Sequence, residues 1–136
     1  MYLSETMADR VLGFKVDLST GALSERRVVA EMLTPDNIEQ DDSGRLWVAS
    51  PIRNEVVVID PESGEIQSVF RPENADNDRI VAEWRRRGEA GEPRLDLLTP
   101  EMWAPMPGLL TGIILTPGGG PVYVSGLGDA LIRLDE

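Results

Sequence analysis

The sequence predicts an all-β fold, a partial β-propeller with one irregular or helical insertion. Short stretches of β-branched and aromatic residues alternate with turn residues along most of the 136-residue chain. An aromatic residue followed closely by serine or glycine opens three of these stretches, at Tyr2, Trp47 and Tyr123, which we expect to pack between blades. The intervals are 45 and 76 positions, the second lengthened by the insertion. Four-stranded repeats of about 40 to 50 residues are typical of propeller blades, whereas a sandwich would not repeat the motif at this interval.

Composition limits the partners of the chain. Hydrophobic residues make up 41% and charged residues 27%, which predicts a packed core rather than disorder. The net charge of -11 disfavours binding to nucleic acid. Neither a run of about 18 apolar residues nor a basic and apolar leader occurs, so we expect no membrane attachment and a cytoplasmic location.

The chain contains no cysteine and no histidine. Their absence excludes disulfides, thiolate nucleophiles, zinc–sulfur sites and Ser-His-Asp triads. Any chemistry must therefore use carboxylates, amides, hydroxyls or arginines, with or without a hard cation. Calcium suits these oxygen ligands best.

Residues 1–33 are interpreted as an incomplete blade of three strands. The first strand starts at Tyr2, the second covers Arg10–Leu18 and the third covers Glu25–Met32. Turn residues at 19–21 separate the last two. Because nothing precedes the first strand, this blade lacks an innermost strand.

Residues 34–72 are interpreted as a complete blade. Four strand candidates follow in close order: Ile38–Gln40, Leu46–Ala49, Val56–Asp60 and Ile66–Phe70. The acidic turn Asp41–Gly44 joins the first two. It lacks the spaced acids and the distant glutamate of an EF-hand, so we interpret it as a plain hairpin turn.

Residues 73–108 interrupt the strand rhythm. A short helix is predicted over Ile80–Arg87, stopped by Gly88 and by Gly91–Pro93. Two interpretations remain open: an insertion that covers a sheet edge, which we favour, or a functional or mobile segment. We expect Arg85–Arg87 to pair with neighbouring carboxylates rather than with phosphate.

Residues 109–136 are interpreted as an incomplete last blade. Its strands are predicted at Ile113–Thr116, Val122–Ser125 and Ala130–Leu134, and the repeat ends at Asp135 without an outermost strand. Two and a half blades are too few to close a ring. We therefore expect the C-terminal part of a larger propeller or, alternatively, one member of an assembly formed through open sheet edges.

The motifs resemble those of the six-bladed calcium-dependent propellers. This group includes gluconolactonase and regucalcin-like proteins, paraoxonases and strictosidine-synthase-like proteins. The resemblance covers most of the chain outside 73–107 and rests on these segments: Asp9-Arg10-Val11, Gly21-Ala22-Leu23, Pro35-Asp36-Asn37-Ile38, Asp42-Ser43-Gly44, Leu46-Trp47-Val48-Ala49 and Thr111–Leu134. The Pro-Asp-Asn form is most similar to the strictosidine-synthase-like and paraoxonase branches.

The resemblance implies a calcium ion on the propeller axis. Asp36 and Asn37 match the position from which this group supplies metal ligands. The ion would polarise the carbonyl of a lactone or ester, the small-molecule substrate, and Asp36 would be the catalytic carboxylate. The structural alternative for both residues is an Asx turn at the entry to a strand.

Two further residues are predicted to line the substrate pocket. Thr111 stands where the last blade would present its entry residue, and Glu5 follows a strand and would face the channel. The alternatives are a hydroxyl that starts a strand and a solvated loop carboxylate.

The chain departs from the pattern of this group in three ways. The other ligands, a glutamate and asparagines from earlier blades, would precede Met1, and the histidines of paraoxonases are absent. No glutamate lies between Gly108 and Asp135, which argues against strictosidine synthesis. We expect a calcium-dependent lactone or ester hydrolase lacking part of its active site. The alternative is a non-catalytic propeller remnant that self-associates or binds a partner.

Overall fold

The structure is a computed structural model that describes residues 1–134. Asp135 and Glu136, the predicted end of the last repeat, lie outside the described residues. The described chain forms three antiparallel sheets of three, four and three strands, with strand order following chain order within each sheet. The all-β prediction and the strand count per repeat are confirmed.

The first sheet contains β1 (Tyr2–Glu5), β2 (Arg10–Val16) and β3 (Leu23–Glu31). The second sheet contains β4 (Ile38–Gln40), β5 (Leu46–Ser50), β6 (Glu55–Ile59) and β7 (Ile66–Phe70). The third sheet contains β8 (Leu110–Leu115), β9 (Val122–Gly126) and β10 (Ile132–Leu134). A short 3₁₀ turn, η1 (Thr6–Ala8), joins β1 to β2.

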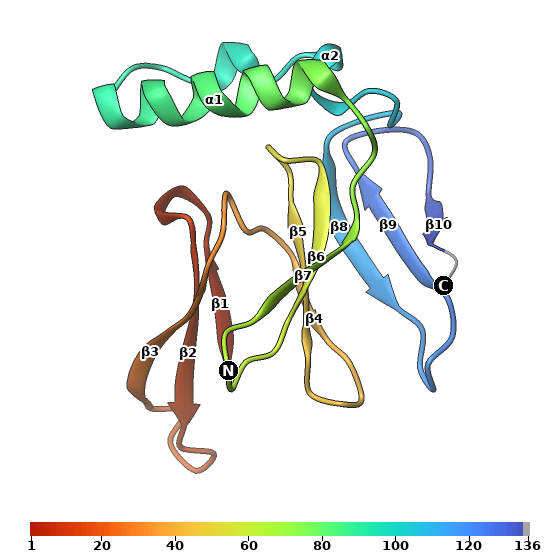
Figure 1. The fold of residues 1–136 in the computed structure, drawn as a ribbon. Helices are drawn as coiled ribbons and strands as arrows, with labels where there is room; N and C mark the ends of the chain where they lie inside the picture. Colours follow the sequence, from red (N-terminus) through yellow and green to blue (C-terminus); the bar gives the residue numbers. More distant parts are fainter. Residues whose placement is uncertain (135–136) are drawn as a thin grey trace.

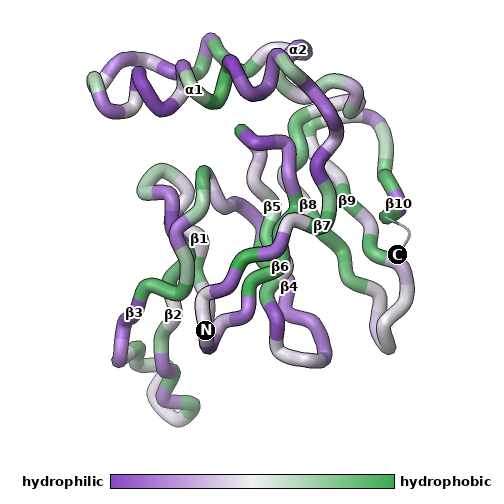
Figure 2. The backbone as a smooth tube through the Cα atoms, in the orientation of Figure 1, coloured by the Kyte–Doolittle hydropathy of each residue, from purple (hydrophilic) through white to green (hydrophobic). Residues whose placement is uncertain are grey.

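The sheets lie side by side in chain order (Figure 1), and the second sheet has a core on both faces. Successive side chains of a strand point to opposite faces. In β5, Leu46 and Val48 therefore join a cluster with the first sheet, while Ala49 joins a cluster with the third. The apolar residues along β5 and β6 in Figure 2 follow from this double burial.

The predicted packing of the repeated aromatic residues is confirmed for two of the three. Tyr2 packs against the cluster between the first and second sheets, and Trp47 packs against the cluster between the second and third. Tyr123 is half-buried and belongs to neither cluster. It pairs with Ile114 and Arg133 across the third sheet.

The insertion forms α1 (Ala75–Ala90), η2 (Leu95–Leu97) and α2 (Pro100–Trp103). Helix α1 begins at Asn74, whose side chain accepts a hydrogen bond from the amide of Asn77, and it ends at Gly91 in the left-handed conformation. The helix is thus longer than predicted. Among the described residues, no helix has the length and apolar character needed to cross a membrane.

Gly88 does not stop α1, contrary to the prediction. A glycine inside a helix costs about 1 kcal/mol relative to alanine, but here it leaves room for a neighbour. A Cβ on Gly88 would lie 2.6 Å from Nη1 of Arg94, the guanidinium that stacks 4.6 Å above the ring of Trp84. The predicted pairing of the arginine run is confirmed for Arg86 and Arg87, which bind carboxylates of the insertion.

The insertion lies across one end of the sheets rather than along a sheet edge. The favoured interpretation, an insertion that covers a sheet edge, was therefore wrong. Figure 1 shows α1 over the end at which β5 stops and β8 starts. The contact is an apolar cluster that joins two loops of the sheets to the insertion and contains Leu33, Ile52, Ile80, Val81, Trp84, Met102 and Leu109.

Candidate metal centre

The segment 33–37 connects the first sheet to the second and carries the two predicted metal ligands. It enters β4 at the end of the sheets that the insertion covers. Strand β4 contacts β8 of the third sheet. Asp36 and Asn37 therefore lie where the second and third sheets meet.

Side chains from both neighbouring sheets fix the backbone of this segment. The amide of Thr34 donates to Oδ1 of Asp9 at 2.8 Å, and the hydroxyl of Ser50 donates to the carbonyl of Leu33 at 2.6 Å. The hydroxyl of Ser4 donates to the carbonyl of Asp36. The sequence analysis missed these positioning roles of Asp9, Ser4 and Ser50. The sequence signal of Ser4 and Ser50 was their place after a repeated aromatic residue, and that of Asp9 was its place in the Asp9-Arg10-Val11 segment of the resemblance.

Strand β5 holds the ligand pair itself. The amide of Asp36 donates to the carbonyl of Ala49 at 2.9 Å, and the amide of Ala49 donates to the carbonyl of Asn37 at 3.1 Å. With the backbone bound on both sides, the two side chains start from fixed positions. Such preorganisation is what a metal ligand or catalytic group requires.

The carboxylate of Asp36 is half-buried and accepts no hydrogen bond from any residue between 1 and 134. Burial raises the pKa of Asp36 above its ordinary value. The side chains of Asp36 and Asn37 form no Asx turn with the described backbone, which removes the structural alternative for this pair. A desolvated carboxylate with no partner costs folding free energy and is typical of functional sites.

Asn37 is exposed, and its amide lies against the third sheet. A Cβ on Gly112 would be 3.6 Å from Nδ2 of Asn37. Thr111, adjacent to this glycine, is half-buried and donates no hydrogen bond within the described residues. The predicted place of Thr111 in a substrate pocket stays a prediction.

Glu5 ends β1 and is bound within the first sheet. Its carboxylate pairs with Arg10 and lies 3.8 Å from Arg26. The hydrogen bond from Arg10 lowers the pKa of Glu5. This carboxylate already has cationic partners, and its predicted place in a substrate pocket stays a prediction.

The donors at the centre fit a hard cation in kind but are few in number. Asp36 offers a carboxylate and Asn37 an amide oxygen, both of which calcium accepts. Within residues 1–134, no group of three or more acidic, histidine or cysteine residues is placed so that it could hold a metal ion. Calcium takes about six to eight oxygens, so further ligands must come from groups beyond these two.

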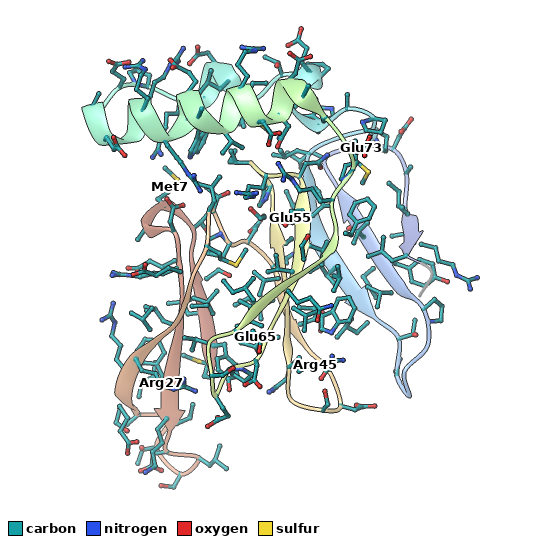
Figure 3. The ribbon with its side chains drawn as sticks, viewed as in Figure 1. Met7, Arg27, Arg45, Glu55, Glu65 and Glu73 are labelled. Carbon is teal, nitrogen blue, oxygen red and sulfur yellow. The ribbon has the colours of Figure 1, made fainter. Side chains whose placement is uncertain are left out.

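Asp41 lies at the opposite end of the sheets, where Figure 3 labels the neighbouring Arg45. Its carboxylate accepts hydrogen bonds from Ser43, Arg45 and Trp47. Partial burial raises the pKa of Asp41, but these hydrogen bonds outweigh it and lower the pKa to about 2. All of its bonding stays near its own turn, which confirms the hairpin-turn interpretation.

Replacing Asp41 with asparagine should remove an acid-sensitive part of the stability. A carboxylate whose pKa falls on folding stabilises the protein above its unfolded pKa, and that stability is lost as the pH falls through the folded pKa. The shift from 3.8 to about 2 corresponds to about 2 kcal/mol, lost between roughly pH 5 and pH 2. Urea unfolding across this range should show a flatter pH dependence for Asp41→Asn. The control is Asp42→Asn, because the adjacent Asp42 carboxylate makes no hydrogen bond within the described chain; equal slopes for both variants would contradict the prediction.

The half of the chain that carries this centre is similar to known proteins. A family model described as the SMP-30/Gluconolactonase/LRE-like region matches residues 1–77. Regucalcin of Danio rerio is 38% identical over 76 residues, and regucalcin of Oryctolagus cuniculus is 37% identical over 76 residues. Each match covers 52% of this chain but only 26% and 25% of the respective relative. The chain therefore spans about a quarter of the length of the curated relatives it matches.

Proposed function

The chain belongs to the SMP-30/gluconolactonase/LRE-like family, and from this premise we propose that it forms part of a calcium-dependent lactone or ester hydrolase. We further propose that its three sheets are neighbouring blades of a six-bladed propeller. The face-to-face order of the sheets supports this arrangement, since propeller blades pack in the same way. Additional blades would close the ring and supply the remaining metal ligands.

The observation that carries the proposal is the carboxylate of Asp36. Within residues 1–134 it is half-buried and has no hydrogen-bond partner, and it lies on a backbone segment held from two sheets. With Asn37 it would hold the ion, which when bound would polarise the substrate carbonyl. An oxygen of Asp36 would accept the proton of the attacking water. Addition of that water, cleavage of the ester C–O bond and return of the proton from Asp36 to the leaving oxygen would give an acid and an alcohol.

Calcium titration by calorimetry tests this proposal. We expect binding that weakens at least tenfold in Asp36→Asn and in Asn37→Ala, and that is unchanged in the control Asp42→Asn. In calcium-free buffer, Asp36→Asn should unfold at the same or a higher temperature, because it removes an unpartnered charge. Failure of the unaltered chain to bind millimolar calcium would rule out a working metal centre in this chain.

A non-catalytic binding module is the second candidate, and one sheet face favours it. In β2, Val11 points toward the second sheet, so the adjacent Leu12 points to the opposite face. Its cross-strand neighbours Leu3 and Val28 are 47% and 46% exposed. Together with the open edge of β1, this face could receive another blade from a second copy or a partner. A mass above that of the monomer by light scattering, without calcium binding, would favour this candidate.

A further inference from the structure

We propose that the insertion is a positioning element for the candidate metal centre, and that Asn54 and Asn77 fix it in place. The inference rests on the proposed function in one respect, namely that the site which the insertion positions is a metal centre. The contacts themselves are independent of that function. We call the two residues the asparagine latch.

Asn77 binds the insertion to the second sheet. It lies in the first turn of α1 and is 2% exposed. Its Nδ2 donates to the carbonyl of Ile52 at 2.8 Å, in the loop between β5 and β6, and to the carbonyl of Met102 in α2 at 2.9 Å. One amide therefore connects both helices of the insertion to a loop of the sheet.

Asn54 makes the reciprocal contact from the sheet side. It lies in the same loop and is 1% exposed. Its Nδ2 donates to the carbonyl of Trp103 in α2 at 3.1 Å. Its backbone has a φ of 53°, a left-handed conformation that asparagine and glycine adopt most readily.

A short series of contacts leads from the latch to Asp36. Ile52 follows two residues after Ser50, whose hydroxyl binds the carbonyl of Leu33. The side chain of Leu33 belongs to the same apolar cluster as Trp84 of α1. Asp36 comes three residues after Leu33. The insertion is thus connected to the ligand segment in two ways. One is the hydrogen bond to the carbonyl of Leu33, and the other is the apolar side chain of Leu33.

The latch is costly for a purely structural contact. Oδ1 of Asn54 and Oδ1 of Asn77 are buried and have no hydrogen-bond partner among the described residues. Buried polar atoms without partners reduce stability, and apolar residues could fill the same cluster at lower cost. Directional hydrogen bonds, in contrast, fix the orientation of the insertion, which apolar contact alone does not.

Amide hydrogen exchange on the intact chain tests the inference without calcium. The variants are Asn77→Ala and Asn54→Gly, the second of which keeps the left-handed backbone. We expect exchange at least tenfold faster at the amides of Asp36 and Ala49, which join the ligand segment to β5. The amide of Asp17, bonded to Ala22 at a distant turn, should be unaffected.

Arg79→Ala is the control. Arg79 also lies on α1 but is exposed, and within the described residues its side chain bonds only to Asp76 of the same helix. This variant should leave exchange at Asp36 and Ala49 unchanged. Unchanged exchange in both latch variants would overturn the inference, and so would equal acceleration at Asp17, which would indicate general loosening.

Calcium affinity provides the second readout. The latch variants, while still folded, should bind calcium at least tenfold more weakly than Arg79→Ala. Unaltered affinity in both of them would overturn the positioning role. If the unaltered chain binds no calcium, the proposed function fails and the exchange result alone decides the inference.

Discussion

Replacing Gly126 with alanine is expected to destabilise the chain by more than about 3 kcal/mol. Gly126 ends β9, where it pairs with Leu110 at the start of β8. A Cβ at this position would overlap the carbonyl oxygen of Leu109 and lie 2.6 Å from its carbonyl carbon and 3.1 Å from Cα of Leu110. All three are backbone atoms, so relief requires moving the strand. That movement would also disturb the hydrogen bond from the amide of Leu127 to the carbonyl of Leu109, 2.9 Å long.

Urea unfolding at low temperature measures this effect, and Gly21→Ala is its control. Gly21 has a φ of 74° but open space around the position of a Cβ. Its replacement should cost only about 1 kcal/mol, the usual penalty for alanine in a left-handed conformation. Similar losses for the two variants would show that the third sheet can shift to accommodate the methyl group.

The second large effect is expected for Leu46→Ala, with a loss of about 3 to 4 kcal/mol. Leu46 is fully buried in β5 and packs in the cluster between the first and second sheets. Truncation removes apolar contact and leaves a cavity among β-branched neighbours such as Val11 and Val29, which cannot readily fill it.

Leu18→Ala is the matched control for this cavity. Leu18 is 96% exposed, so the same change should alter the free energy of unfolding by less than about 0.5 kcal/mol. The comparison isolates burial, because both variants lose the same atoms. A loss below about 1 kcal/mol for Leu46→Ala would mean that the two sheets close over the gap.

The strands were predictable because their signals are local. The run of aromatic and aliphatic residues in β5 and the turn residues on either side of it suffice to place that strand, and the bonds of Asp41 span at most six residues. The C-terminal end of helix α1 was predicted three residues too early because Gly88 was judged by its helix propensity alone. Its role in admitting Arg94 is a tertiary effect that local pattern does not reveal.

The candidate centre was predictable only in part, and through resemblance. Asp36 and Asn37 were identified in this way, but the residues that hold them were not. Asp9, Ser50 and Ser4 reach the ligand segment across 25, 17 and 32 positions of the chain. Contacts of such separation depend on how sheets assemble, and no sequence period encodes them. The ion pair of Glu5 with Arg10 spans only five positions, but it depends on the register between β1 and β2.

The two-sided core of the second sheet makes the molecule a short stack in which each layer is supported by its neighbours. Stability in such stacks is approximately a sum of layer terms and nearest-neighbour interface terms. The outer layers each have one such interface and the middle layer has two. Opening should therefore begin at either outer layer and reach β5 and β6 last, so the most slowly exchanging foldon is expected at the centre of the chain.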